Sequence, residues 1–460
     1  MMNTKLPLYE QIRDDLASQI SNGKFALGDR LPSEPELCEY YEVSMITVRR
    51  AISELVRAGL LYTVQGKGIF VSERRQVPAS GGTVRFVRYD WPLDISNQIL
   101  EAFAQEEPEC RVEPISLSMG HGMRELVKGG LGDIFVLRED ELPGLMAEGA
   151  LLDLTEFAQR DLDLDAYYPE PFRFCCTESR LYAFPVTFSP IVMVYNRAHF
   201  QEAGLEYPDG WDWETFLEYA RRLTVCGGED GRVTRYGFFL RGQVNRWTTF
   251  LLQNNGGVFD ANGNFILDST RSLEALWFCR DMMIKHRVSP IGAPDDPARP
   301  FVTGAASMFP ESYYYVHDTE ANLEWDMGRL PRRRTQATLY VGEHLGIQRD
   351  CQHPELAWKV LKAFISASAQ RRFLEQGMGG PVLRSVVEEE GVPAWLPKHR
   401  DLFWEEMEMT RPIYWGNDST AMKTFVSNAM EMVWSGVETP EEACAEIRRK
   451  IGQTEGFKRF

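Results

Sequence analysis

Residues 31–71 read LPSEPELCEYYEVSMITVRRAISELVRAGLLYTVQGKGIFV, and this stretch decides the fold of the N-terminal part of the chain. Ser33 and Glu36 have the spacing of a capping box, in which a serine hydroxyl and a glutamate carboxylate satisfy free amides at a helix start. A short helix over about residues 33–41 is therefore expected. Ser44 is the next capping residue, and it opens a second helix with an apolar inner face and a polar, basic outer face.

Two short strands and an earlier helix complete this small unit. The segments LLYTV and IFV flank a Gln-Gly-Lys-Gly turn at 65–68, which is the pattern of a β-hairpin. Upstream, apolar side chains recur every fourth residue and predict an amphipathic helix that stops at Asn22-Gly23, with an inner face made of Leu8, Ile12, Leu16 and Ile20. The N-terminal unit is therefore expected to contain three helices and a two-stranded wing.

The quoted motif resembles the GntR family of bacterial regulators over about residues 6–73. The resemblance implies a winged helix-turn-helix whose recognition helix enters the major groove of DNA while its wing tip reaches the minor groove. Pro35 and Met45 stand where the family often has arginine, so the base sequence that is read can differ. The residues expected to contact DNA are Ser44, Met45, Thr47, Arg49, Arg50, Gly66 and Lys67. A protein-docking role for the same fold is the alternative.

Charge and composition agree with an intracellular protein that has one DNA-binding end. The chain has 460 residues and a formal net charge of −17. Residues 1–75 hold ten basic and ten acidic side chains, so the whole acidic excess lies after residue 75. No apolar run approaches the ~18 residues of a membrane span, and no signal peptide precedes the first helix. The eight cysteines lack the spacing of a disulfide framework or a zinc site, so a cytoplasmic location is expected.

A domain boundary is predicted in the stretch QVPASGGT, residues 76–83, which is rich in small and turn-forming residues. The DNA-binding domain would then cover residues 1–75 and a ligand-sensing domain residues 84–460. After the boundary, strand patterns at 84–89, 111–118 and 132–139 alternate with helix patterns, which predicts a parallel α/β sheet. The pattern restarts after Pro190, with helices expected near 212–224, 245–255, 269–287 and 354–377, so two α/β lobes are expected.

The larger domain resembles bacterial extracellular solute-binding proteins of the sugar-binding, maltose-binding class. The resemblance rests on LYAFPVTFSPIVMVYNRAHFQEAGLEYPDGWDWETF at 181–216, LLQNNGGVFDANGNFILDS at 251–269 and HPELAWKVLKAFISASAQRRFLEQGMGGPV at 353–382. It implies a multidomain fold class: an α+β winged helix-turn-helix followed by a two-lobed α/β, type II periplasmic-binding-protein-like domain. Such proteins normally carry an export signal, and its absence here indicates reuse as a sensor.

Ligands of two-lobed α/β proteins lie beyond the carboxyl ends of the strands, so the loops there are the candidate site. Sugar sites combine aromatic platforms with polar side chains that bind hydroxyl groups. The expected stacking residues are Trp91, Trp247 and Tyr313, and the expected hydroxyl partners are Asp90, Glu139 and Glu311, with Phe188 at the hinge. Tyr414, Trp415 and Asn417 are further candidates, whereas Trp211, Trp213 and Trp277 have the patterns of structural residues.

The sequence thus predicts a homodimeric regulator that binds operator DNA, senses a sugar and controls genes of carbohydrate uptake or catabolism. A DNA-binding scaffold whose solute-binding domain has lost its ligand is the alternative. We expect no enzyme activity, cofactor or metal, because no lysine has the context of a Schiff-base residue, no Walker or G-x-S-x-G motif is present, and the seven histidines are scattered.

Overall fold

The computed structural model divides the chain into two compact units, Met1–Gly81 and Gly82–Phe460. The structure describes residues 9, 12–13, 15–16, 19, 24–25, 29–41, 43–57, 61–64, 68–71, 82–89, 93–117, 123–208, 210–227, 231–240, 242, 244–291, 299–312, 323–390, 402–415 and 419–453. Each unit is considered by itself below.

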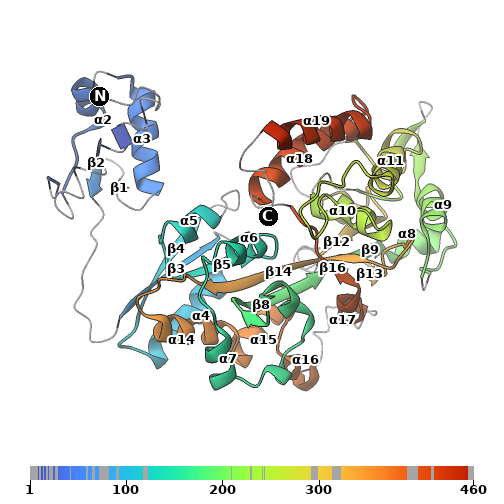
Figure 1. Cartoon of the computed structure of the whole chain (residues 1–460). Coiled ribbons are helices and arrows are strands. Elements are labelled where there is room, and N and C mark those ends of the chain that lie inside the picture. The colour runs from blue at the N-terminus through green and yellow to red at the C-terminus, as the bar shows by residue number, and fades with distance from the viewer. Residues whose placement is uncertain are drawn as a thin grey trace. The chain divides into compact units, whose positions relative to one another are not determined.

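The N-terminal unit is a small helical core with a β-hairpin (Figure 1). Its elements are α2 (Glu34–Tyr41), α3 (Met45–Arg57), β1 (Leu61–Val64) and β2 (Gly68–Val71), and β1 pairs antiparallel with β2. Apolar side chains from all parts of the unit pack together, namely Ile12, Leu16, Leu31, Leu37, Val48, Ala51, Ile52, Leu55, Leu61 and Ile69. Four of them, Val48, Ala51, Ile52 and Leu55, recur at helical spacing along α3. This spacing explains why one face of that helix is buried and the opposite face is left accessible.

The larger unit has two lobes, and the first is built on a mixed sheet with the strand order β15-β8-β14-β5-β3-β4. Its strands are β3 (Thr83–Tyr89), β4 (Arg111–Leu117), β5 (Ile134–Arg138), β8 (Ala183–Pro190), β14 (Thr338–Ile347), β15 (Gly380–Pro381) and β16 (Thr410–Arg411), with a separate hairpin of β6 (Cys176–Thr177) and β7 (Arg180–Leu181). The strands β3, β4 and β5 are parallel, as the sequence predicted, whereas β14 runs antiparallel to β5 and β8.

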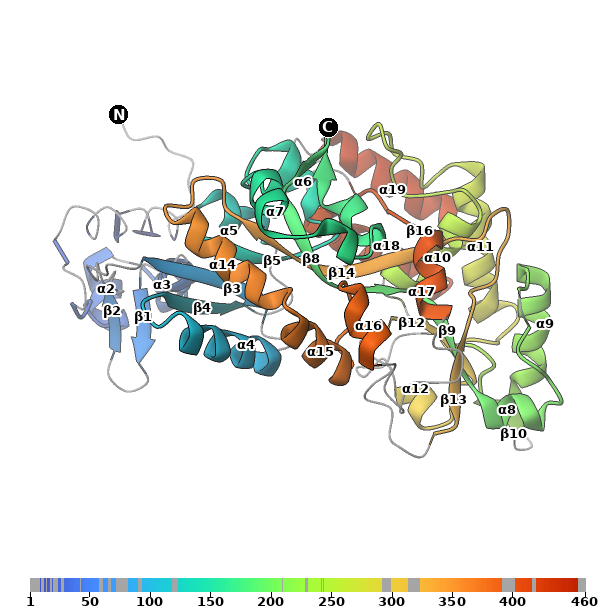
Figure 2. The same ribbon diagram turned by 90° about the horizontal axis from the view of Figure 1, so that it is seen from below.

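Helices cover both faces of this sheet. Those of the first lobe are α4 (Leu93–Glu106), α5 (Arg124–Lys128), α6 (Leu142–Ala147), α7 (Thr155–Asp161), α14 (Pro354–Phe364), α15 (Ala367–Glu375), α16 (Arg384–Glu390) and α17 (Leu402–Glu405), with 3-10 turns at Leu164–Ala166, Glu170–Phe174 and Glu406–Met409. Figure 2 shows α4, α14 and α15 along one face, and α5 and α6 lie on the other. The single helix expected near 354–377 is two helices, because Ser366 caps α15 by accepting a hydrogen bond from the Ala369 amide at 3.3 Å.

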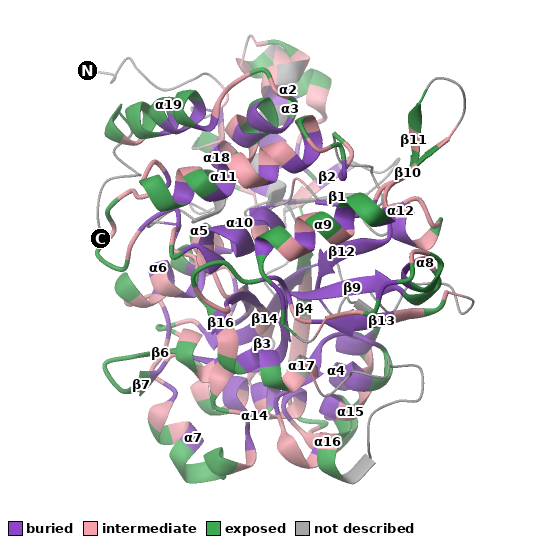
Figure 3. Cartoon of the chain, turned by 90° about the vertical axis from the view of Figure 1, so that its right-hand side faces the viewer, coloured by how far each residue is buried: buried purple, intermediate pink, exposed green. Residues whose placement is uncertain are grey.

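The second lobe is a three-stranded sheet, β12-β9-β13, enclosed by helices. Its elements are β9 (Val192–Asn196), α8 (Arg197–Glu202), α9 (Trp213–Leu223), β10 (Val225–Gly227), β11 (Arg232–Arg235), α10 (Val244–Gln253), α11 (Thr270–Ile284), α12 (Arg299–Val302), β12 (Met308–Glu311), β13 (Trp325–Gly328), α18 (Ser419–Trp434) and α19 (Pro440–Gln453). Figure 3 shows that the three strands are the buried centre, whereas α19 and α9 expose much of their surface. The helices predicted near 212–224, 245–255 and 269–287 are α9, α10 and α11.

The strand β9 is shared between two hydrophobic cores. Ile191, Met193 and Tyr195 belong to the core of the second lobe, whereas Val192 and Val194 join the core that extends from the first lobe. The same change of core occurs along β14, where Leu339 packs in the second core and the next residue, Tyr340, in the first. Successive side chains of a strand point to opposite faces. Each of these short segments therefore contributes side chains to both cores and connects the two lobes.

Candidate functional site

The start of α3 in the N-terminal unit is organised by Ser44. Its carbonyl oxygen accepts the amides of Thr47 at 3.0 Å and Val48 at 3.2 Å, and its hydroxyl lies 2.8 Å from the Thr47 hydroxyl. The predicted capping box before α2 is present in part: the Glu36 carboxylate accepts both the amide and the hydroxyl of Ser33 at 2.7 Å. The two caps fix where each helix begins and thereby the angle of the turn between them.

Arg49 is the one basic residue of α3 whose side chain the structure describes. Its side chain is 64% exposed, and its Nε donates to the Glu34 carboxylate of α2 at 2.8 Å. Met45 lies on the same helix with its sulfur 3.9 Å from the Cys38 thiol, so it is held partly against α2. The side chain of Arg50, and Gly66 and Lys67 of the wing turn, lie outside the described residues. The described part of α3 thus presents one exposed arginine, paired with a carboxylate of α2, near the capped start of the helix.

A narrow cavity lies between the two lobes, and we call it the interlobe cavity. It has a volume of about 40 Å³, which is room for one or two water molecules. Both lobes contribute to its lining, which consists of Glu139, Asp140, Pro143, Phe174, Val244, Asn245, Thr248, Leu339, Tyr340, Pro412, Ile413, Tyr414, Trp415 and Lys423. A sugar ring needs several times this volume, so the cavity is too small to hold one in this arrangement of the lobes.

An ion pair closes the cavity from opposite sides. Lys423 Nζ, on α18 of the second lobe, lies 2.8 Å from Asp140 Oδ2, which follows β5 in the first lobe. The Asp140 side chain is only 3% exposed. The same ammonium lies 5.7 Å from the centre of the Trp415 ring, within the range of a cation–π interaction.

Two further carboxylates beside this ion pair resist ionisation. Burial, reinforced by the charge of Asp140, raises the pKa of Glu139 to about 7, although Lys423 opposes the shift. Burial and the neighbouring Glu139 likewise raise the pKa of Glu343 on β14 to about 7. The Gly342 amide donates to Glu139 Oε2 at 3.3 Å. Three carboxyl groups therefore lie close together at the carboxyl end of β5, and two of them keep their protons to a higher pH than an ordinary glutamate does.

A buried hydrogen-bonded pair supports this edge of the sheet from behind. The Tyr340 hydroxyl lies 3.0 Å from His344 Nε2, and His344 Nδ1 lies 3.2 Å from the Leu137 carbonyl oxygen. Burial lowers the pKa of His344 to about 4, so the imidazole is neutral at physiological pH. Its ring nitrogens therefore fix the Tyr340 side chain without adding charge to the cavity.

The sequence-predicted ligand residues divide between the cavity and the core. Glu139, Tyr414 and Trp415 line the interlobe cavity. Trp247, by contrast, is fully buried in the core of the second lobe and packs edge-on against Trp434 at 5.7 Å. Asn245 and Thr248 of the same helix face the cavity instead, so the helix presents polar side chains there and turns its tryptophan away.

Glu311 and Phe188 are also buried elsewhere. Glu311 forms a fully buried ion pair with Arg246 of α10, and its carboxylate also accepts the Ser312 amide at 2.7 Å. Phe188 is 1% exposed and packs edge-on against Tyr168 at 5.9 Å. In this arrangement neither side chain lies on the interlobe cavity. The predicted residues Asp90, Trp91, Tyr313 and Asn417 lie outside the described residues.

Sequence reasoning missed most of the cavity's walls. Asp140 was detectable, because residues 139–141 are three carboxylates in a row directly after a buried strand. Lys423 had no such signal, since it comes from a helix that follows Asp140 in the chain by more than half the length of the second unit. Phe174 and Tyr340, whose rings stack at 4.1 Å, come from a 3-10 turn and the crossing strand β14. Only tertiary structure brings these groups together.

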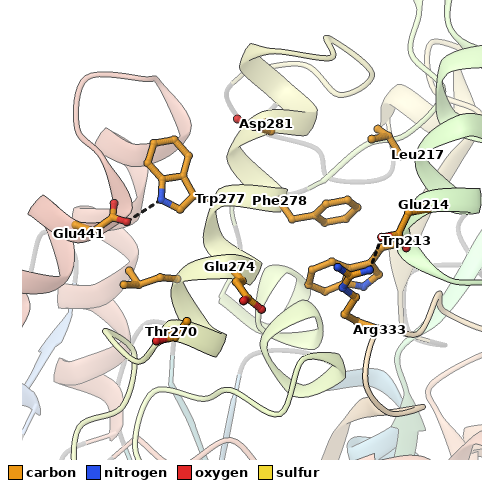
Figure 4. Close-up of a pocket in the computed structure, with 11 residues that line it drawn as sticks. Trp213, Glu214, Leu217, Thr270, Glu274, Trp277, Phe278, Asp281, Arg333 and Glu441 are labelled. Atoms are coloured by element: carbon orange, nitrogen blue, oxygen red, sulfur yellow. Dashed lines mark hydrogen bonds and ion pairs between the residues drawn. The ribbon is translucent and has the colours of Figure 1, made fainter.

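A larger hollow of about 700 Å³ lies on the second lobe alone, between α9, α11 and α19 (Figure 4). Trp213 stacks on Phe278 at 4.3 Å, Arg333 pairs with Glu214, and the Trp277 indole donates to Glu441 at 2.8 Å. Trp213 is almost fully buried, whereas Trp277 is partly exposed. Because every wall comes from one lobe, a change in the angle between the lobes would leave this groove unaltered.

No group of three or more metal-ligating side chains lies together among the described residues. None of the helices in the described part of the chain is long and apolar enough to cross a membrane.

Two family models match the chain. Residues 93–371 match the bacterial extracellular solute-binding protein family, and residues 8–71 match the bacterial regulatory proteins of the gntR family. The first match covers more than half of the chain.

Two relatives of the N-terminal part of the chain are transcriptional repressors. The HTH-type transcriptional repressor NagR of Bacillus subtilis is 43% identical over 81 residues, which are 18% of this chain and 33% of that protein. The repressor STM4068 of Salmonella typhimurium is 33% identical over 118 residues, which are 25% of this chain and 49% of that protein. The chain therefore spans no more than about half the length of these relatives.

Solved structures with the fold of the second unit are solute-binding proteins. The substrate-binding protein Lmo0181 of Listeria monocytogenes, in complex with cycloalternan, has a TM-score of 0.70 and 20% identity, covering 82% of this chain and 100% of its own. Maltose-bound MalE3 of T. maritima has a TM-score of 0.67 and 20% identity, covering 80% of this chain and 98% of its own. These likenesses confirm the predicted fold class. The chain belongs to the bacterial extracellular solute-binding protein family and carries a gntR-family helix-turn-helix domain at its N-terminus.

Proposed function

We propose that the protein is a sugar-responsive, DNA-binding transcription regulator of carbohydrate uptake or catabolism genes. The observation that carries the proposal is the presence, on one chain, of a gntR-type DNA-binding unit and a hinged solute-binding unit with a polar, aromatic cavity between its lobes. The relatives of the first unit are repressors and those of the second are binding proteins, so the chain is proposed to bind and not to catalyse.

The DNA-binding surface is proposed to be the start of α3 together with the wing. The side chains assigned to it are those of Ser44, Met45, Thr47, Arg49 and Arg50, with Gly66 and Lys67 at the wing tip. Arg49 supports the assignment most directly, because its guanidinium is exposed beside the capped helix start. An arginine in this position can contact a guanine edge or a phosphate.

The effector is proposed to bind between the lobes and to change their angle. Glu139, Tyr414 and Trp415 are proposed contacts, and Asp90, Trp91 and Tyr313 remain proposed contacts from loops outside the described residues. A cavity of about 40 Å³ must widen to admit a sugar, and a ligand that binds the two arrangements with different affinity shifts their equilibrium. In a homodimer in the cytoplasm, that shift would alter the spacing of the two DNA-binding units on paired half-sites.

The smallness of the interlobe cavity also favours one alternative. A domain that has lost its ligand and serves only for dimerisation or protein contacts would keep its lobes closed by the Lys423–Asp140 ion pair. The two functions differ in whether any sugar alters DNA binding.

The test begins with the full-length protein and a selected operator duplex. A thermal-shift screen against mono- and oligosaccharides comes first, because a ligand at a hundredfold excess over its Kd stabilises the folded state by about 2.7 kcal/mol. Fluorescence anisotropy then measures operator affinity with and without each hit. Under the proposal a hit changes operator affinity by fivefold or more, and Glu139→Gln weakens the sugar response while leaving sugar-free DNA binding intact. Operator affinity that no binding sugar alters would favour the scaffold.

A further inference from the structure

The described residues around the interlobe cavity include more carboxyl groups than cationic groups. Glu139 and Asp140 line it, Glu141 follows them in the chain, and Glu343 is the register partner of Arg138 between β14 and β5. Among the described residues the nearby cations are Lys423, paired with Asp140, and Arg138, whose guanidinium lies 3.5 Å from Asp140 and 3.3 Å from Glu141. In the described part of the site, four carboxyl groups thus lie near two cations.

Glu139 and Glu343 are the two carboxylates left over. In the described part of the chain neither has a cationic nitrogen within 4.0 Å, and the contact made to Glu139 by another residue is the Gly342 amide. A carboxyl group whose pKa is raised because it has no counter-ion ionises more readily when a cation arrives beside it, so the site gains from binding a cation and not from binding an anion. Charge therefore selects the kind of ligand that can enter.

The walls of the cavity suit an ammonium group. Phe174, Tyr340, Tyr414 and Trp415 surround the carboxylates, and ring faces together with carboxylates are the usual receptor for an organic ammonium ion. The Lys423 ammonium already occupies such a position, 2.8 Å from Asp140 and 5.7 Å from the Trp415 ring centre. The protein thus fills the site with an ammonium group of its own.

We propose that the ligand of the interlobe cavity carries an ammonium group, as an amino sugar does, and that this group binds Glu139 and Asp140 in competition with Lys423. The choice of a sugar rests on the proposed function, whereas the ammonium rests on the cavity itself. Without ligand, Lys423 satisfies Asp140 and holds the lobes together. When the lobes part, Lys423 and Trp415 leave with the second lobe, and the carboxylates of the first lobe are open to the ligand.

The first test replaces the internal ammonium with an external one. In full-length Lys423→Ala the cavity gains the space of the lysine side chain, and n-butylammonium should raise the melting temperature in a dose-dependent manner. n-Butanol, which has the same shape without the charge, should not do so. The double variant Asp140→Asn/Lys423→Ala lacks one of the two proposed carboxylates and should respond clearly more weakly. If n-butanol stabilised Lys423→Ala as well as n-butylammonium, or if the double variant responded equally, the inference would be overturned.

A second variant covers the case in which Lys423→Ala does not fold. Lys423→Met keeps an aliphatic stem against Trp415 and removes only the charge, and methylammonium is the matching small probe. Stabilisation of Lys423→Met by methylammonium, absent with methanol, supports the inference. Equal effects of the two probes contradict it.

The second test compares sugars in pairs with the wild-type, full-length protein. D-Glucosamine, D-galactosamine and D-mannosamine are measured by calorimetry against their N-acetyl forms and the parent hexoses. At least tenfold tighter binding of one amine, about 1.4 kcal/mol, supports the inference. If neutral sugars bind as tightly as the amino sugars, the ammonium inference is overturned, but the proposed sugar-responsive function is not. If no sugar binds, sugar sensing is contradicted, and the butylammonium experiment still decides on the ammonium.

Discussion

Lys423 and Asp140 join the two lobes through an ion pair of 2.8 Å in which the carboxylate is almost fully buried. A second lysine–carboxylate pair of the same length, Lys359–Glu107, lies within the first lobe and on its surface, with side chains that are 47% and 37% exposed. The two pairs have the same N···O distance, but they differ in burial and in whether they join the two lobes.

This contrast gives a first prediction about stability. Lys423→Met should lower the free energy of unfolding by about 2–4 kcal/mol, because it leaves the buried Asp140 carboxylate with the more distant Arg138 as its described counter-ion. Lys359→Met should change it by less than about 1 kcal/mol, as expected for an exposed pair. Urea unfolding of both variants measures the difference. Equal losses in the two variants would mean that the Lys423 pair is solvated and does not hold the lobes together.

A second prediction concerns pH and Glu343. Its pKa is raised to about 7 by burial and by Glu139, so the folded state binds a proton more tightly than the unfolded state does. The contribution of Glu343 to the free energy of unfolding is fully present below its unfolded-state pKa of about 4.5. This contribution is lost as the pH rises through the folded-state pKa of about 7. Glu343→Gln should therefore be more stable than the wild type at pH 8, by on the order of 1–3 kcal/mol, and similar to it at pH 4.5.

Other ionisable groups near Glu343 also change the stability of the wild type with pH, so the effect of Glu343 has to be measured as the difference between the wild type and Glu343→Gln. Asp140, Arg138 and Lys423 face the same site, and the lowered pKa of His344, caused by burial, gives the wild type an opposite slope below about pH 6.5. Melting temperatures of the wild type and Glu343→Gln at pH 4.5, 6 and 8 isolate Glu343, since the other groups are common to both. If Glu343→Gln were no more stable than the wild type at pH 8, ionisation of Glu343 in the folded state would carry no free-energy cost, and the prediction would be wrong.

The third prediction addresses Glu311, which sequence reasoning assigned to ligand binding. Its fully buried pair with Arg246 indicates a structural role. Glu311→Gln should cost about 3–5 kcal/mol, because it leaves the guanidinium buried without a counter-ion. Arg246→Met combined with Glu311→Leu should recover much of that loss. If Glu311→Gln instead abolished ligand binding and left the unfolding curve unchanged, the residue would belong to the binding site.

The fourth prediction separates DNA contact from folding at Arg49. Arg49→Ala should weaken operator binding by about tenfold to a hundredfold, as expected for a lost base or phosphate contact. Its stability should change by less than about 1 kcal/mol, because the pair with Glu34 is exposed. Glu34→Gln is the matched control: it frees Arg49 from its partner and should leave operator affinity equal or higher. A loss of affinity in Glu34→Gln would show that the pair itself positions α3.

The fold could be predicted well from local patterns, and the cavity could not. The capping residue Ser44 and the wing hairpin lie within one short stretch of chain, where spacing determines structure. Trp247 shows where prediction from local patterns fails. A tryptophan near a helix start is equally consistent with a ligand-stacking residue and with a core residue, and its packing against Trp434 identifies it as a core residue. The partner of Asp140 is Lys423, which no periodicity connects to it.

The alternation of β9 between two cores limits how this protein can change in evolution. Odd-numbered residues from Ile191 to Tyr195 fill one core and even-numbered residues the other. A single-residue insertion or deletion in this strand would exchange the two sets and bring each side chain to a core shaped for its neighbour. Loops between helices tolerate changes of length, but this hinge does not. Variation in effector preference should therefore arise by substitution in the cavity walls and by altered loop lengths, while the count of residues from β8 to β9 stays constant.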